Sequence, residues 1–135
     1  MQSNRDIVVA VFAETAKGNG RAFSEAMADD MTWRIIGATY WSGTFSGREA
    51  IVRDLLKPLG QRLGGRNVCR PTRILADGDH VVVQACGENT TVEGKAYRND
   101  YCFVLRMENG RMAALEEYSD TQLIVDALGE KPGAG

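Results

Sequence analysis

YRNDYCFVLRMENGRMAALEEYSD, residues 97–120, predicts two β-strands joined by a tight turn. The turn falls at Glu108-Asn109-Gly110, because a Gly after an Asn supplies the positive φ that short hairpin turns require. In the first strand, alternate residues carry large apolar or aromatic groups and one amide: Tyr97, Asn99, Tyr101, Phe103, Leu105 and Met107. The residues between them include Arg98, Asp100, Arg106 and Glu108. We therefore expect one face of this strand to line the core or a pocket and the other to face water.

The length of the turn decides which side chains of the second strand share that inner face, because a slip of one residue exchanges the two faces. A three-residue loop, with Gly110 as a bulge residue, places Leu115 opposite Phe103 and Glu117 opposite Tyr101. We favour this loop because it lines the inner face with apolar side chains and leaves one carboxylate there.

The alternative is a two-residue loop, which turns Glu116 and Tyr118 inward instead. In the favoured register Glu117 lies beside Tyr101 and Asn99. A carboxyl group surrounded by aromatic rings and an amide is expected to have a raised pKa, and a raised pKa suits acid–base chemistry.

Composition excludes several classes of protein. A chain of 135 residues is expected to form a single domain, residues 1–135. The formal net charge of -2 gives no electrostatic basis for binding nucleic acid or an anionic membrane surface. An apolar run at residues 7–13 is far shorter than the roughly 20 residues of a membrane span, and it lacks the flanks of a signal peptide. We therefore expect a cytoplasmic protein.

Cysteine and histidine usage argues against metal binding and thiol catalysis. Cys69, Cys86 and Cys102 lie far apart, each in an expected strand, which is typical of buried free thiols. His80 is the single histidine and lies beside a turn, so we expect neither a Cys–His nucleophile nor a transition-metal site. The prediction is a protein without a metal or another cofactor.

The first third of the chain predicts two helices and a strand. Apolar residues at helical spacing indicate a helix over residues 4–16, which Ser3 or Asn4 is placed to cap. A shorter helix is expected over residues 21–28. Alternating side chains in Met31–Ile36 then predict a strand.

A loop and a third helix follow. The loop over residues 37–43 contains Tyr40 and Trp41, which either cap the core or line the mouth of a ligand pocket. Ser46-x-x-Glu49 has the form of a capping box at the start of a helix. Pro58 is expected to kink or end that helix at the residue before it.

From residue 66 the pattern changes to strands. Runs over residues 66–76 and 80–91, with a turn between them, precede the hairpin described above and complete an antiparallel meander of four strands. Residues 31–36 can be added to this sheet, and Ser119-x-x-Gln122 opens a final helix. Helices before a long antiparallel sheet predict an α+β fold, a curved sheet with helices packed on its concave face and a pocket inside the resulting cone.

Five motifs occur in an order and spacing that can be compared with known families: Asp29-Asp30-Met31-Thr32-Trp33, Gly47-Arg48-Glu49-Ala50-Ile51, Gly94-x-x-Tyr97-x-Asn99-x-Tyr101, Asn109-Gly110-Arg111 and Glu117-Tyr118-x-Asp120-Thr121. They resemble the SnoaL-like group of the nuclear transport factor 2-like superfamily, which includes polyketide cyclases, limonene epoxide hydrolase and ketosteroid isomerase. The resemblance implies a cone-shaped α+β barrel, often assembled as a homodimer through the sheet.

The resemblance also implies roles for individual residues. Glu117 stands where epoxide hydrolases and cyclases of the group place an acidic residue on the last long strand, and Asn99 and Tyr101 match their recurring Asn-x-Tyr. Two family features are missing. Residues 83–88 lack the Arg-x-Asp pair of the epoxide hydrolases, and residues 34–36 lack the general-base Asp of the ketosteroid isomerases.

These observations predict a cofactor-free enzyme of cyclase, isomerase or hydrolase type that acts on a small hydrophobic carbonyl or hydroxylated compound. Glu117 is the expected acid or base, with Tyr101 and Asn99 holding a developing enolate or alkoxide. The expected pocket walls are Trp33, Tyr40, Trp41, Tyr97, Phe103 and Leu115. Two alternatives are a protein that binds a hydrophobic ligand without changing it and a dimerisation module whose cavity is filled by side chains.

Overall fold

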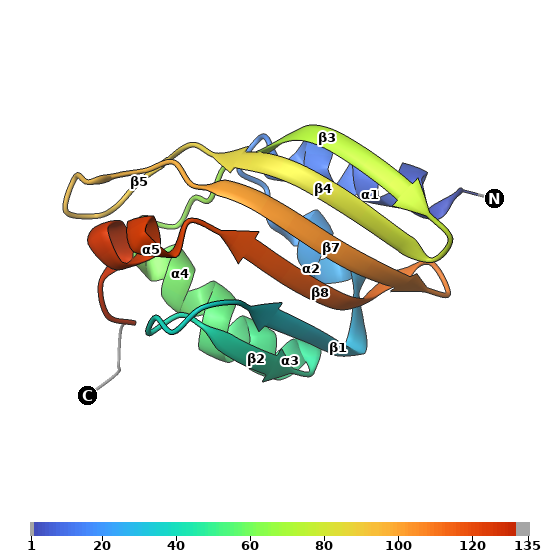
Figure 1. Cartoon of the computed structure of the whole chain (residues 1–135), viewed down its shortest axis with the longest axis horizontal. Coiled ribbons are helices and arrows are strands. Elements are labelled where there is room, and N and C mark those ends of the chain that lie inside the picture. The colour runs from blue at the N-terminus through green and yellow to red at the C-terminus, as the bar shows by residue number, and fades with distance from the viewer. Residues whose placement is uncertain (1, 132–135) are drawn as a thin grey trace.

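The computed structural model describes residues 2–131. Within this range a six-stranded sheet has the order β2-β1-β8-β7-β4-β3, and the separate pair β5–β6 projects beyond one end of it (Figure 1). The strands are β1 (Met27–Ile35), β2 (Gly43–Ser46), β3 (Cys69–Asp77), β4 (His80–Gly87), β5 (Asn89–Thr90), β6 (Ala96–Tyr97), β7 (Asp100–Glu108) and β8 (Arg111–Ser119). The helical segments are α1 (Asn4–Thr15), α2 (Arg21–Ala26), α3 (Arg48–Ile51), the π-helical turn η1 (Val52–Leu56), α4 (Lys57–Arg62) and α5 (Thr121–Leu128).

The helices α1 to α4 lie against one face of the curved sheet, and α5 lies at its end (Figure 1). The hydrophobic core fills the space between the two layers, where Val8 and Phe12 of α1 meet strand residues such as Met31 and Leu105. This arrangement confirms the α+β class with helices on one face. The sheet is open, because in the described part of the chain its edge strands β2 and β3 pair on one side alone, so the barrel is not closed.

The β7–β8 hairpin has a register that neither expected loop provides. Asn109 and Gly110 both have positive φ, 52° and 77°, and form a two-residue turn, so the favoured three-residue loop is wrong. Farther along, Ala113 is left without a partner, because Met107 pairs with Met112 and Arg106 pairs with Ala114. This bulge shifts the register by one residue and places Glu117, not Leu115, opposite Phe103. Glu117 therefore points inward, as expected, although for a different reason.

The first two strands extend the sheet beyond the expected meander. β1 begins at Met27 rather than Met31, and it pairs with β8 in parallel, whereas the sheet was expected to be antiparallel throughout. Its other edge pairs with β2, a strand that was not predicted and that lies between the end of the expected loop and the expected helix cap. The β3, β4, β7 and β8 order confirms the four-stranded meander, although the β5–β6 pair interrupts the connection from β4 to β7.

Neither of the two later capping boxes forms, because the N-cap of each helix lies one residue beyond the expected serine. Ser46 pairs with Thr32 as the last residue of β2, so Gly47, with φ 91°, makes the transition into α3 instead. Ser119 pairs with Tyr101 at the end of β8, so Asp120 becomes the cap of α5 and accepts the N–H groups of Gln122 and Leu123. Strand pairing thus takes each serine out of the capping position. Ser3 does cap α1, in a capping box with Asp6.

Pro58 does not end the helix that precedes it. The helix continues from Arg48 to Arg62, and a π-helical turn lies directly before the proline. In that turn the N–H of Lys57 donates to the carbonyl of Val52, five residues earlier. Such widening accommodates a proline ring that would otherwise clash with the preceding turn. Among the described helices, none is long and apolar enough to cross a membrane.

Candidate active site

A cavity of about 290 Å³ lies between the sheet and the helices. Aromatic rings form part of its walls, namely those of Phe12, Phe23, Trp33, Trp41, Tyr97, Tyr101 and Phe103. The exposed members of the lining, Gly20, Gly65 and Asn67, come from the α1–α2 and α4–β3 loops, so the cavity opens to solvent between these loops. The volume is at the lower end of the range for small-molecule sites.

Glu117 is the carboxylic acid in this lining, and its side chain is almost completely removed from water. The residue is 8% exposed. The Trp33 indole N–H donates to Oε1 of Glu117 at 3.2 Å, and it is the one hydrogen bond of this carboxyl within residues 2–131. Burial raises the pKa of Glu117 to about 7, and the Trp33 hydrogen bond opposes that increase. At neutral pH the group can therefore both accept and release a proton.

A pair of tyrosine hydroxyls lies on the same face of the sheet. Tyr101 donates to the hydroxyl oxygen of Tyr97 at 3.3 Å, and both side chains line the cavity. Tyr101 pairs with Ser119, two residues beyond Glu117, so Tyr101 and Glu117 are diagonal neighbours on adjacent strands. Burial raises the pKa of both phenols, and that of Tyr101 strongly, so both keep their protons at neutral pH.

Asn99 does not occupy the catalytic position expected for it. Its side chain is fully buried and is not part of the cavity lining. The amide instead bonds to the backbone of Asp120 and to the Tyr97 hydroxyl. The chain leaves β6 before Asn99 and enters β7 after it, so the structure places this side chain at the β8–α5 junction, behind Tyr97, and not in the cavity wall.

Four of the six residues expected in the pocket wall line the cavity, namely Trp33, Trp41, Tyr97 and Phe103. Tyr40 does not, because its side chain is 61% exposed on the loop surface. Leu115 does not either, because it is packed within the core at 1% exposure. The assignment of Tyr40 and Leu115 to the pocket wall is therefore wrong.

Much of the remaining wall comes from helices, whose contribution to the pocket was not predicted. Phe12 and Phe23 of α1 and α2, and Ile124 and Leu128 of α5, line the cavity. These residues belong to the apolar stripes by which the helices were recognised. Because a stripe does not show which of its members face a void rather than another side chain, the sequence signal identifies them only as core.

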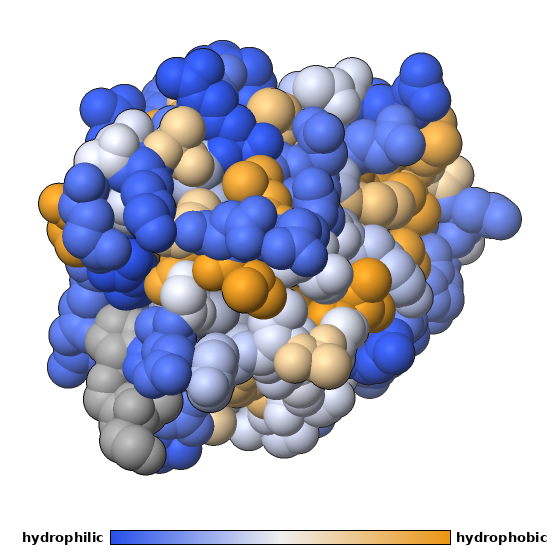
Figure 2. Space-filling view, turned by 60° about the vertical axis from the view of Figure 1, so that its left-hand side comes forward, coloured by the Kyte–Doolittle hydropathy of each residue, from blue (hydrophilic) through white to orange (hydrophobic). Residues whose placement is uncertain are grey.

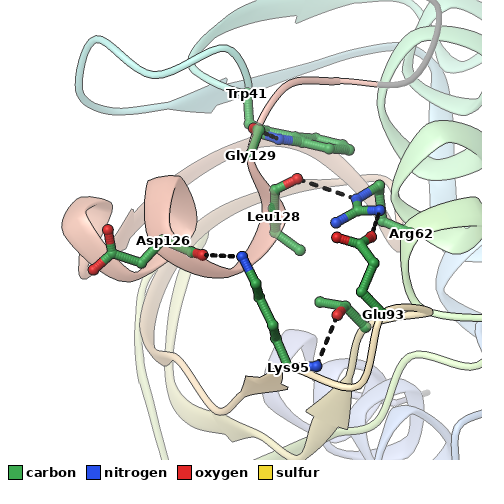
Figure 3. Close-up of polar contacts among 8 residues, drawn as sticks. Trp41, Arg62, Glu93, Lys95, Asp126, Leu128 and Gly129 are labelled. Atoms are coloured by element: carbon green, nitrogen blue, oxygen red, sulfur yellow. Dashed lines mark hydrogen bonds and ion pairs between the residues drawn. The ribbon is translucent and has the colours of Figure 1, made fainter.

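One end of the cavity is closed by α5, which polar contacts hold in place (Figure 3). The guanidinium of Arg62 donates to the carbonyl of Leu128 at 3.1 Å and forms an ion pair with Glu93 of the β5–β6 connection. The Trp41 indole N–H donates to the carbonyl of Gly129 at 3.0 Å. The last turn of α5 is therefore tied to α4 and to the loop before β2. Figure 2 shows this end of the molecule, where hydrophobic residues emerge in scattered patches among hydrophilic ones.

Cys69 also lines the cavity, but burial raises the pKa of its thiol to about 12, so the thiol stays protonated at neutral pH. Cys69, Cys86 and Cys102 are all free thiols, as expected. In the described part of the chain, no three His, Cys, Asp or Glu side chains come together in a way that could hold a metal ion. Glu117 is thus the side chain in the cavity best suited to proton transfer.

Replacing Trp33 by Phe is expected to raise the pKa of Glu117 further. The substitution removes the hydrogen bond that favours the carboxylate, and such bonds to charged groups contribute about 1.5–3 kcal/mol, equivalent to about one or two pKa units. The pKa can be measured by NMR titration of the Glu117 carboxyl carbon. Trp41→Phe is the matched control, because its indole N–H bonds to Gly129 instead. An unchanged pKa in Trp33→Phe would show that this hydrogen bond has no influence on the carboxyl.

Comparison with known proteins gives one family match and many similar structures. The family model for the SnoaL-like domain matches residues 8–115. No curated protein matches the sequence. An NTF2-like protein from Burkholderia thailandensis is 22% identical with a TM-score of 0.81, covering 95% of this chain and 98% of its own. A putative SnoaL-like polyketide cyclase from Jannaschia sp. CCS1 is 16% identical with a TM-score of 0.76, covering 96% and 93%.

TerC, co-crystallised with polyporic acid, is 23% identical to this chain with a TM-score of 0.77, covering 93% of this chain and 97% of its own. A protein with a cystatin-like fold from Xanthomonas campestris is 21% identical with a TM-score of 0.81, covering 96% and 100%. At these levels of identity the structural similarities establish the fold.

Proposed function

The chain belongs to the SnoaL-like domain family, and we propose that it is a cofactor-free enzyme that moves protons on a small, flat, hydrophobic carbonyl compound. The observation that carries this proposal is the position of Glu117, a carboxylic acid with a pKa near 7 in the wall of an aromatic cavity. A general base is most effective when its pKa lies near the working pH.

The proposed step begins with the ionised form of Glu117. The carboxylate removes a proton from the carbon next to the substrate carbonyl, and the electron pair of the broken C–H bond moves to the carbonyl oxygen as an enolate. A hydroxyl of the tyrosine pair donates a hydrogen bond to that oxygen. The enolate then either takes the proton back from Glu117 at the same or another carbon, or attacks a second carbonyl of the same molecule to close a ring. In the second case the C=O of the second carbonyl becomes an alkoxide, which takes the proton from Glu117 and restores the carboxylate.

The walls of the cavity support a flat hydrophobic substrate. Tyr101 and Phe103 are stacked with their planes 14° apart, and the ring of Phe23 lies 5.4 Å from that of Trp33. Such surfaces bind planar ring systems by contact and by exclusion of water. The ligand of TerC and the description of the Jannaschia protein as a putative polyketide cyclase link two structural neighbours with organic small molecules, in agreement with this substrate class.

The test is a deuterium-exchange assay with 1-indanone, a flat bicyclic ketone. The protein is expected to accelerate exchange of the protons next to the carbonyl with D₂O, followed by proton NMR, because exchange requires the proposed proton transfer and no later step. Binding is followed separately by thermal shift, since a ligand at 100 times its Kd raises the free energy of unfolding by about 2.7 kcal/mol. Binding without accelerated exchange would refute the proposal and favour a protein that holds a ligand without changing it.

A further inference from the structure

The Asn99 side chain bridges the active-site tyrosines and the start of α5. Its Oδ1 accepts the backbone N–H of Asp120 at 3.0 Å, and its Nδ2 donates to the Asp120 carbonyl at 3.1 Å and to the Tyr97 hydroxyl at 3.2 Å. Because a backbone N–H can only donate, the amide oxygen must face Asp120 N, and the NH₂ group therefore faces Tyr97. The backbone thus fixes the orientation of this amide.

A fixed amide also fixes the role of the Tyr97 hydroxyl. The oxygen of Tyr97 accepts one hydrogen bond from Asn99 and a second from Tyr101. A hydroxyl has two lone pairs and one hydrogen, so both lone pairs are occupied and the hydrogen remains. Within residues 2–131 no protein acceptor for this hydrogen is present, and Tyr97 lines the cavity at 3% exposure. The remaining hydrogen is thus available to a ligand.

We propose that Asn99 is a positioning residue, which keeps the Tyr97 hydroxyl as a hydrogen-bond donor toward the cavity, and that the substrate places its carbonyl or enolate oxygen there. This inference rests on the proposed function and adds which atom of the substrate is recognised and which residue sets the direction of the bond. A ligand without an acceptor at this place leaves the buried O–H unpaired, so it binds less tightly than its apolar area alone predicts.

Asn99→Asp reverses the hydrogen bond between residue 99 and the Tyr97 hydroxyl, so that Tyr97 becomes the donor. A carboxylate still accepts the N–H of Asp120 but cannot donate, so it accepts the hydrogen of Tyr97. The hydrogen of Tyr101 stays on the Tyr97 oxygen, as in wild type, and neither phenolic hydrogen is then directed at the cavity. The probes are 1-indanone and indane, which have the same ring system with and without the oxygen. We expect the ratio of their affinities, measured by NMR titration, to shift about tenfold toward indane relative to wild type, the effect of one hydrogen bond. An unchanged ratio in a folded variant would overturn the proposal.

Asn89→Asp is the matched control. Asn89 is also buried, and its amide brackets a backbone in the same manner, accepting the N–H of Val68 at 2.8 Å and donating to the Val68 carbonyl at 3.1 Å. Its backbone pairs with that of Tyr97, but its side chain makes no hydrogen bond to either tyrosine hydroxyl. The ratio of affinities in Asn89→Asp is therefore expected to match that of wild type. A general loss of packing would change the ratio of affinities in both variants. An equal shift of the ratio in Asn89→Asp would therefore refute the role assigned to Asn99.

A second variant keeps the test decisive if Asn99→Asp does not fold. The double variant Tyr97→Phe/Tyr101→Phe removes both phenolic hydrogens and keeps the Asn99 bonds to Asp120, and it is expected to show the same shift of the affinity ratio. All ratios are measured in the Glu117→Gln background, where proton transfer is expected to be at least about one hundred times slower. A shifted ratio with no exchange activity in the wild-type chain would refute the proposed function alone, whereas exchange activity with an unchanged ratio would refute the role of Asn99 alone.

Discussion

Glu117→Gln is expected to slow the exchange of the 1-indanone protons by a factor of at least about one hundred. General acid–base catalysis by a positioned side chain contributes about 10² to 10⁴ in rate, and Gln has nearly the shape of Glu but cannot act as a base near neutral pH. The amide oxygen can still accept the Trp33 N–H, so the cavity keeps its form. Affinity for 1-indanone, measured by NMR titration, is expected to stay within a few-fold of the wild-type value.

Glu116→Gln is the matched control for this experiment. Glu116 is the preceding residue on β8, but it lies on the outer face, exposed and paired with Arg34. It has the same carboxyl group on the opposite side of the sheet. Glu116→Gln is therefore expected to exchange the 1-indanone protons at the wild-type rate. Full exchange activity in Glu117→Gln, or an equal loss in both variants, would show that the inward carboxyl is not the base.

The free energy of unfolding is expected to fall by about 3 kcal/mol between pH 4.5 and pH 7 because of Glu117 alone. Below pH 4.5 the carboxyl is protonated in both states. Between these values the unfolded chain ionises while the folded protein, with its pKa of about 7, keeps the proton, so stability decreases by about 1.4 kcal/mol per pH unit. Above pH 7 both states are ionised and this contribution no longer changes.

Urea unfolding of wild type and Glu117→Gln across pH 4 to 8 isolates this contribution, because other titrating groups affect both proteins alike. The difference in free energy of unfolding between the two is expected to change with pH by about 3 kcal/mol in favour of the variant as pH rises. A difference that stays constant from pH 4 to pH 8 would contradict the raised pKa.

Local patterns in the sequence were sufficient to predict the fold class and the inner face of β7. Alternation from Tyr97 to Met107 identifies that face because side chains alternate strictly along a strand. The Asn109-Gly110 turn was recognised from its chemistry. The α+β architecture followed from helical stripes ahead of strands. These features depend on residues close together in the chain, and the structure confirms them.

What could not be predicted depends on partners distant in sequence. The bulge at Ala113 has no sequence marker of its own, and in the structure it leaves the neighbouring residues Met112 and Ala113 both buried. The serines of the two expected capping boxes were assigned to helices because local spacing does not show how far the strand pairing extends.

Asn99 was assigned to the substrate for a similar reason. Its bonds to Asp120 join the residue before β7 to the residue after β8, which lie 21 positions apart in the sequence, a contact that no local pattern indicates. The parallel pairing of β1 with β8 and the tie between Arg62 and Leu128 also join segments far apart in sequence.

The most direct measurement is the titration of Glu117 itself. Carbon-13 NMR of protein labelled at the Glu carboxyl carbons follows each carboxyl with pH, and the signal missing in Glu117→Gln identifies the residue. We expect this signal to titrate with a midpoint near pH 7, well above the ordinary value for a glutamate side chain. A midpoint near 4.5 would mean that the carboxyl is solvated, and it would contradict the proposal that Glu117 transfers protons at neutral pH.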